Sequence, residues 1–201
     1  MKTLITNFLS NSSVINCPKD KKPEYAFIGR SNVGKSSLIN MILNTKIAYT
    51  SSKPGKTQLI NHIIINNDWS LVDLPGYGYA QLSKKKRYEI LMMTKNYLTK
   101  RGIQLAAVFM LIDIRIKAQK IDLEWMQWMV QNNIYFIRIF TKCDCINKQK
   151  IQKQIENYNN TMKEQNWSRI PETIITSSNK KNGKIEILEK INELNILFQN
   201  I

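Results

Sequence analysis

The sequence predicts an α/β fold with a mostly parallel sheet of six or seven strands and helices on both faces. Near-continuous apolar runs, which are typical of strands buried on both faces, alternate along the chain with segments of helical character. In addition, 43% of the 201 residues are hydrophobic, which is enough to bury the core of one domain. Sheets of this kind bind ligands at the carboxyl ends of their strands.

The expected elements follow a regular order. We expect strands at 25–28, 59–66, 69–73, 105–112, 134–140 and 173–175, and helices at 37–44, 84–101, 121–131, 148–165 and 185–198. Asn67 and Asp68 are expected to turn a hairpin, and Ser83 to cap the helix that follows it. Residues 1–22 are expected to form an N-terminal extension or an edge strand near Val14, and residues 23–201 the body of a single domain.

Charge and cysteine content narrow the functional classes. The net charge of +15, from 30 Lys and Arg against 15 Asp and Glu, suits a polyanionic partner, although an AT-biased genome would also enrich Lys, Asn and Ile. Cys17, Cys143 and Cys145 form no disulfide framework and no metal-binding pattern. Neither a signal peptide nor an apolar run long enough for a membrane span is apparent. We therefore expect a cytoplasmic protein.

The segment 29–36 has the composition of a phosphate-binding loop between a strand and a helix. Gly29 and Gly34 allow the backbone N–H groups to turn inward, and the helix N-terminus adds partial positive charge. Lys35 would reach the β- and γ-phosphates, and the Ser36 hydroxyl would bind a bridging Mg²⁺. The candidate phosphate-binding residues are Gly29, Arg30, Ser31, Asn32, Val33, Gly34, Lys35 and Ser36.

Two later loops have the features of nucleotide-dependent switches. Asp73 ends a strand expected beside the first one, where its carboxylate can hold Mg²⁺ through water, and the Gly76 N–H can bond the γ-phosphate. Thr57 closes a polar loop and is a candidate second Mg²⁺ ligand when triphosphate is bound. The candidate residues of the two loops are Gly55, Lys56, Thr57, Gln58, Leu59, Asp73, Leu74, Pro75 and Gly76.

A further motif predicts recognition of guanine. The Asp144 carboxylate can accept hydrogen bonds from guanine N1–H and its exocyclic amine, a donor pair that adenine lacks, while the Lys142 stem can lie across the nucleotide rings. Backbone N–H groups after the last strand could meet the guanine carbonyl. His62 is interpreted as a strand residue and not as a catalytic base. The candidate base-binding residues are Thr141, Lys142, Cys143, Asp144, Thr176, Ser177 and Ser178.

Taken together, these motifs resemble those of the EngB family (also called YihA or YsxC) of bacterial ribosome-assembly GTPases. The resemblance covers residues 23–198, and the sequence Gly-Tyr-Gly-Tyr-Ala at 76–80 is specific to that family among small GTPases; the stretch from Asp113 to Arg115, with Asp122 after it, is also similar. The resemblance implies the P-loop GTPase fold (G domain) and Mg²⁺-dependent GTP hydrolysis in which Lys35, Thr57 and Gly76 act. It also implies a role in maturation of the large ribosomal subunit and a requirement for the protein in normal division septation.

Two positions depart from Ras-like enzymes. Tyr77 stands where those enzymes carry the Gln that orients the attacking water, so we expect slow intrinsic turnover. Asn32 matches the position at which related GTPases hold K⁺, so K⁺ or a ribosomal contact is expected to supply the missing stabilisation. Thr141 replaces the commoner Asn of the base motif, where the residue braces the loop.

Three questions stay open at this point. A P-loop kinase or ATPase would share the phosphate loop but not Asp144. A septin-like or membrane-division GTPase scaffold would need polymers or lipid binding, and no amphipathic membrane helix is evident. The basic run 84–87 opposes the macrodipole of its helix, which indicates rRNA contact unless it is only a solvated charge run. We expect GTP and GDP, ribosomal precursor rRNA and no membrane as partners, and a monomer.

Overall fold

The computed structural model describes residues 4–48, 59–78 and 82–200. It contains one seven-stranded sheet in the order β1-β3-β4-β2-β5-β6-β7. Both pairings of β3 are antiparallel, whereas the pairings from β4 through β2, β5 and β6 to β7 are parallel, so the predicted mostly parallel sheet is confirmed. The strands are β1 (Ile5–Asn11), β2 (Glu24–Gly29), β3 (Ile60–Ile65), β4 (Trp69–Asp73), β5 (Leu105–Asp113), β6 (Phe136–Thr141) and β7 (Thr173–Ile175).

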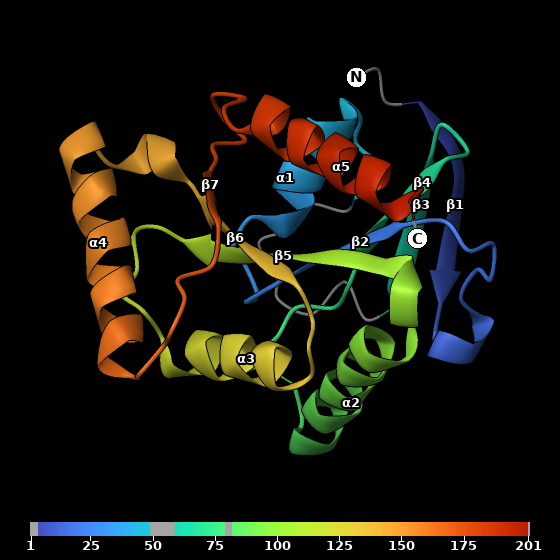
Figure 1. The fold of residues 1–201 in the computed structure, drawn as a ribbon, viewed down its shortest axis with the longest axis horizontal. Coiled ribbons are helices and arrows are strands. Elements are labelled where there is room, and N and C mark those ends of the chain that lie inside the picture. Colours follow the sequence, from blue (N-terminus) through green and yellow to red (C-terminus); the bar gives the residue numbers. More distant parts are fainter. Residues whose placement is uncertain (1–3, 49–58, 79–81, 201) are drawn as a thin grey trace.

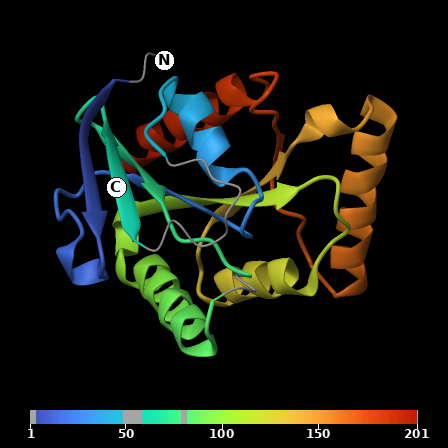
Figure 2. The ribbon, with the colours of Figure 1, turned by 180° about the vertical axis from the view of Figure 1, so that it is seen from behind.

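Helices cover both faces of this sheet, as predicted (Figures 1 and 2). On one face, α1 and α5 pack over a core that includes Tyr25, Phe27 and Phe109. On the other face, α2, α3 and α4 enclose a second core around Met110, Trp125 and Phe140, with α4 at the end of the sheet opposite β1. The helices are α1 (Lys35–Leu43), α2 (Lys84–Lys100), α3 (Lys120–Gln131), α4 (Lys148–Glu164) and α5 (Lys184–Phe198). None of the helices in the described part of the chain has the length and apolar character needed to cross a bilayer.

Local chemistry explains most element boundaries. Ser83 caps α2, because its Oγ accepts a hydrogen bond from the Lys86 N–H at 3.2 Å, as expected. The β3–β4 reversal centres on Asn66 and Asn67, one residue earlier than expected, since both adopt a positive φ that suits a tight hairpin. The edge strand is also earlier than expected: it is β1, whereas the segment around Val14 forms a short 3₁₀ helix (Val14–Asn16).

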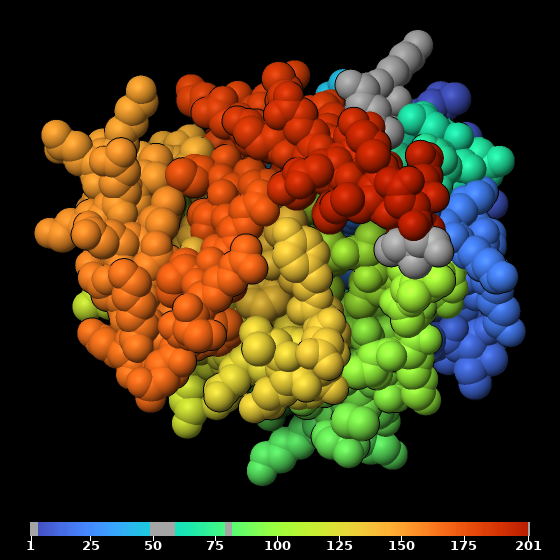
Figure 3. Space-filling view, in the orientation of Figure 1, coloured from blue at the N-terminus to red at the C-terminus, as the bar shows by residue number. Residues whose placement is uncertain are grey.

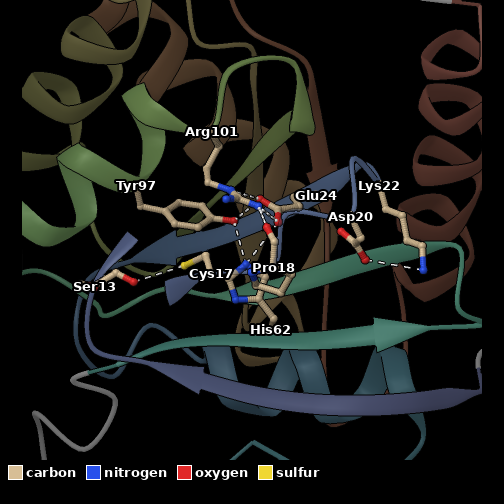
Figure 4. A network of polar contacts seen from close by, with 9 residues as sticks. All are labelled: Ser13, Cys17, Pro18, Asp20, Lys22, Glu24, His62, Tyr97 and Arg101. Carbon is tan, nitrogen blue, oxygen red and sulfur yellow. Dashed lines mark hydrogen bonds and ion pairs between the residues drawn. The ribbon is translucent and has the colours of Figure 1, made fainter. Parts of the chain in front are cut away.

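A buried polar network fastens the end of α2 to the start of the sheet (Figure 4). His62, Tyr97 and Arg101 all point toward the carboxylate of Glu24, which is 1% exposed. Arg101 donates to both carboxylate oxygens, His62 Nε2 lies 3.3 Å from Oε1, and the Tyr97 hydroxyl donates to Oε2. Burial disfavours the charged form of Glu24, but the hydrogen bonds from His62, Arg101 and Tyr97 outweigh it and lower the pKa of this carboxyl. This network anchors α2 at the edge of the sheet remote from the carboxyl ends of its parallel strands.

Replacing Glu24 by Ala is therefore expected to lower the free energy of unfolding by about 3–5 kcal/mol, because Arg101 would keep a buried charge without its partner. Urea unfolding measures this, with the exposed Glu89 of α2 as a control whose replacement by Ala costs under about 1 kcal/mol.

Because folding lowers the pKa of Glu24, its ionised form stabilises the protein fully above the unfolded pKa of about 4.3. That contribution is lost as the pH falls, so the stability gap between the wild type and Glu24→Gln should narrow below about pH 4. A gap that does not change with pH would contradict this assignment.

Candidate functional site

The site begins where β2 turns into α1. Gly34 caps α1 with φ +104°, a conformation that favours glycine, and the first helical bond runs from the Leu38 N–H to the Gly34 carbonyl at 2.9 Å. A Cβ at Gly29 would lie 2.9 Å from both the Leu111 carbonyl oxygen and Val33 Cγ1, so only glycine lets the loop pack against β5. The N-terminus of α1 consequently faces the edge of the sheet at which the parallel strands end.

Lys35 and Asp73 meet inside this edge. Lys35 is the first residue of α1 and Asp73 is the last residue of β4, the parallel neighbour of β2. Their side chains, 9% and 4% exposed, form an ion pair between Lys35 Nζ and Asp73 Oδ1. The contact places the cation of the phosphate loop and the candidate switch carboxylate within reach of the same group.

The segment after Asp73 is attached to the phosphate loop by its backbone. The Tyr77 N–H donates to the Gly29 carbonyl at 3.1 Å, and the Tyr77 carbonyl accepts from the Ser31 N–H at 3.0 Å. Nearer the strand, the Leu74 N–H donates to the Phe27 carbonyl at 3.2 Å. These bonds fix Leu74 and Tyr77 at either side of Pro75 and Gly76, so the Gly76 amide lies close to the loop that would hold the phosphates.

The Tyr77 side chain turns away from this edge into the core. It is 7% exposed, and its ring stacks on Trp125 of α3 with ring centroids 5.4 Å apart. Its hydroxyl donates to Asp122 Oδ1 at 2.9 Å, and Arg30 Nε lies 3.1 Å from the same oxygen. Burial raises the pKa of Asp122, and the Arg30 charge opposes that rise. A phenol held in this position does not orient a water molecule beside the phosphates.

Asp144 stands just after β6, in the loop expected to read the base. Its Oδ1 accepts from the Ser177 hydroxyl at 2.6 Å and its Oδ2 from Asn179 Nδ2 at 3.3 Å, and the Ser177 hydrogen bond is the main cause that lowers the pKa of this carboxyl. Its side chain is exposed. Asp144 is therefore an oriented, ionised acceptor at the rim of the site.

The amides of Thr176 and Ser177, which were expected to meet the guanine carbonyl, bond to the chain itself. The Thr176 N–H donates to the Phe140 carbonyl at 2.7 Å, and the Ser177 N–H donates to the Asn182 carbonyl at 3.2 Å. Both residues are buried and their amides are engaged inside the chain, so they are not available to a guanine carbonyl. Of the three candidates after β7, Ser178 keeps that role, since it lines the cavity described below.

Two residues of the base motif brace the phosphate loop. The single hydroxyl proton of Thr141 is shared between the carbonyls of Val33, at 2.7 Å, and Ile112, at 3.2 Å. Lys142, with φ +61°, extends Nζ to the Asn32 carbonyl at 2.7 Å and to Asp113 Oδ2 at 2.9 Å. Lys142 thus spans the gap between the base motif and the phosphate loop, along the path expected for a nucleotide ring.

Asp113 also lies at the site, where it contacts Lys142, although no role for it follows from the sequence. Burial raises its pKa, but the hydrogen bonds from Arg115 and Lys142 outweigh burial and hold the pKa at about 2. Its position could have been recognised from the sequence, because Asp113 ends β5 as Asp73 ends β4. Polar residues at the ends of parallel strands gather at this edge of the sheet. Cys143, by contrast, is a buried filler whose N–H donates to the Thr176 carbonyl at 3.1 Å.

A cavity of 860 Å³ runs from the start of α1 to the base loop. Its volume lies within the range of small-molecule sites. Among the candidates of the first switch loop, Gly55, Lys56, Thr57 and Gln58 lie outside the described residues, and Leu59 is exposed just before β3. The cavity is lined by Gly34, Ser37, Asn40, Met41, Asn44, Thr45, Lys46, Thr141, Lys142, Asp144, Cys145, Ser178, Asn179 and Lys181.

Fold and site together define a P-loop GTPase, in which a strand–loop–helix unit, a strand-end carboxylate and a base-reading acid share one edge of the sheet. Comparisons with known proteins agree. The profile of the family described as "50S ribosome-binding GTPase" matches residues 24–142. The EngB GTP-binding protein of Flavobacterium johnsoniae is 54% identical over 97% of this chain and 93% of its own length. The EngB GTP-binding protein of Phocaeicola vulgatus is 49% identical over 97% of this chain and 98% of its own length. The chain belongs to the EngB family and is a GTP-binding, GTP-hydrolysing enzyme.

Solved structures show the same fold. A crystal structure of an EngB protein matches with a TM-score of 0.67 and 22% identity, over 86% of this chain and 98% of that one. Era in complex with MgGDPNP and nucleotides 1506–1542 of 16S ribosomal RNA also matches with a TM-score of 0.67 and 22% identity, over 86% of this chain and 56% of that chain. At this level of identity the similarity concerns the fold alone.

Proposed function

We propose that this GTPase is a nucleotide switch in assembly of the large ribosomal subunit, that it acts as a cytoplasmic single-domain monomer with residues 23–201 as its G domain, and that normal division septation depends on it. The observation that carries the proposal is the set Lys35, Asp73 and Asp144 at one edge of the sheet, in a chain whose family profile is described as ribosome-binding. The net charge of +15 supports an RNA partner.

The donor set suits Mg²⁺. Hydroxyl and carboxylate oxygens are ligands of the kind Mg²⁺ prefers. The Ser36 hydroxyl, next to Lys35 in the chain, and the Thr57 hydroxyl are the candidate ligands, and Asp73 would hold the ion through water. When bound, Mg²⁺ neutralises charge on the β- and γ-phosphate oxygens. Lys35 would leave Asp73 to bind the same phosphates, and the Gly76 N–H would bond the γ-phosphate. Asp144 would accept hydrogen bonds from the guanine base.

Turnover is proposed to be slow because Tyr77 is buried against Trp125 and no side chain at its position faces the phosphates. K⁺ beside Asn32 or a contact with the ribosome would then supply the missing stabilisation. Comparing turnover in KCl and NaCl, with and without large subunits, distinguishes the two sources. Equal, slow rates under all four conditions would count against both.

Depletion of the protein from cells, followed by sucrose-gradient sedimentation, tests the role in assembly. We expect immature large-subunit particles to accumulate before septation fails. Normal particle profiles combined with failed septation would support a division scaffold instead.

The exposed run Lys84, Lys85, Lys86 and Arg87 at the start of α2 is proposed as the RNA contact, since α2 follows the Asp73–Gly76 segment that would sense the γ-phosphate. Among the described residues, Lys86 pairs with Glu89 at 3.3 Å, and no ion pair links the other three. Reversing all four charges is expected to weaken cosedimentation with large subunits by about tenfold or more and to reduce its salt dependence.

The matched control reverses four exposed lysines of α4, which lies beyond α3 from α2: Lys148, Lys150, Lys153 and Lys163. The side chains of α4 project from one end of the molecule (Figure 3). If both variants lose the same affinity, net charge explains the binding and α2 is not the contact. Unchanged binding of the α2 variant would refute the assignment directly.

A further inference from the structure

One buried carboxylate joins three separate parts of the site. Asp122 lies in the first turn of α3 and is 1% exposed. Its Oδ1 receives both Arg30, from the phosphate loop, and the hydroxyl of Tyr77, from the segment after Gly76, at 3.1 and 2.9 Å. The Asp122 side chain therefore links the phosphate loop and the segment after Gly76 through one carboxylate oxygen.

Packing alone does not account for an acid at this position. Asp122 Oδ2 is buried and has no hydrogen-bond partner among the described residues, which makes the carboxylate costlier than an apolar residue of similar size. Trp125, one turn later on α3, already supplies apolar contact to the Tyr77 ring. What the Asp122 carboxylate adds to this packing is one oxygen that contacts both Arg30 and the Tyr77 hydroxyl.

Main-chain hydrogen bonds connect the two segments that Asp122 links, beside the place where the phosphates would bind. Arg30 and Tyr77 are also paired through main-chain bonds, from the Tyr77 N–H to Gly29 and from the Ser31 N–H to Tyr77. Gly76, whose amide is the candidate ligand of the γ-phosphate, directly precedes Tyr77 in the chain. A diphosphate has no group at that place, so the positioning of Gly76 concerns the triphosphate alone.

We propose that Asp122 is a positioning residue that holds Gly76 against the phosphate loop and thereby sets the preference of the site for guanosine triphosphate over diphosphate. The inference rests on the proposed role of Gly76 at the γ-phosphate. Asp122 itself does not touch the nucleotide. It fixes the distance between the segments that do, so part of the ordering cost of the triphosphate state is met before the nucleotide binds.

The test compares the affinities of GDP and a non-hydrolysable GTP analogue in the full chain with Mg²⁺. Asp122→Ala is expected to weaken analogue binding by about tenfold, the scale of a hydrogen bond to a charged group, and GDP binding by less than about twofold. Tyr77→Phe keeps the ring on Trp125 and loses only the hydroxyl, so about a threefold loss for the analogue is expected. Glu124→Ala is the control, since this exposed carboxylate lies on the same helix and pairs only loosely with Lys120, at 3.8 Å.

The ratio of the two affinities separates positioning from general damage. A merely structural role would lower the melting temperature and both affinities together, leaving the ratio unchanged, and would overturn the inference. If Asp122→Ala does not fold, the ratio for Tyr77→Phe decides, and an unchanged ratio again overturns it. A wild-type chain that fails to bind GDP would refute nucleotide binding itself, which is a different failure.

Discussion

Replacing Asp144 by Asn is expected to shift the nucleotide preference of the protein from GTP to xanthosine triphosphate. The carboxylate accepts two donors from guanine, whereas an amide presents a donor where guanine also presents one. Xanthine carries a carbonyl in place of the exocyclic amine and so matches the amide. With guanine bound to the Asp144→Asn variant, donors of the amide and of the base would face each other without acceptors. GTP affinity should therefore fall by at least about a hundredfold.

Competition against a fluorescent guanine nucleotide measures this change. The control is Asp20→Asn, because Asp20 is an acid in the surface turn before β2 and, within the described ranges, pairs only with Lys22, at 3.5 Å. The Ser177 hydroxyl, which donates to Asp144 Oδ1 at 2.6 Å, can donate in the same way to the amide oxygen of an Asn, so a side chain of the same shape keeps its shorter orienting hydrogen bond. Retention of full GTP preference by Asp144→Asn would show that another residue reads the base.

Lys35→Ala is expected to abolish detectable binding of GDP and GTP. The ammonium is buried and already directed at the edge of the sheet, where its present partner is Asp73. Its loss removes the cation for the β- and γ-phosphates and leaves a buried carboxylate that repels them. Both consequences act in the same direction, so the effect should exceed that of any single hydrogen bond.

Ligand-dependent thermal stability measures this effect. Saturating GDP stabilises a binding-competent chain by about 2.7 kcal/mol at a hundred times the Kd, and this shift should vanish in Lys35→Ala. Lys120→Ala is the control, because that lysine is 91% exposed on α3 and should leave the shift intact. A normal GDP shift in Lys35→Ala would remove Lys35 from the phosphate site.

The parts of the fold that the sequence predicted correctly are those that follow from local order. The phosphate loop needs only a strand, a glycine turn and a helix start, which occur together between Gly29 and Lys35. Asp73, at the end of β4, and Asp144, after β6, could be proposed as site residues because the ends of parallel strands share one edge. Helix α2 was placed by its cap, Ser83.

The remaining features depend on contacts between distant segments. The sequence gives no sign that Asp122 of α3 binds Arg30 of the loop, or that Tyr77 points inward, because both require the α3–sheet packing. The predicted roles of the Thr176 and Ser177 amides failed for the same reason, since their partners come from β6 and from the turn before α5. Within residues 1–22 the edge strand lies at β1 and not near Val14, because β1 is recognisable only through its pairing with β3.

Titration of the purified protein with a fluorescent GDP in the presence of Mg²⁺, followed by displacement with unlabelled GDP and ADP, tests the central claim most directly. The arrangement of Lys35, Asp73 and Asp144 predicts saturable binding that GDP reverses and that ADP does not reverse at the same concentration. Absence of binding, or equal displacement by ADP, would contradict the assignment of this edge of the sheet as a guanine-nucleotide site.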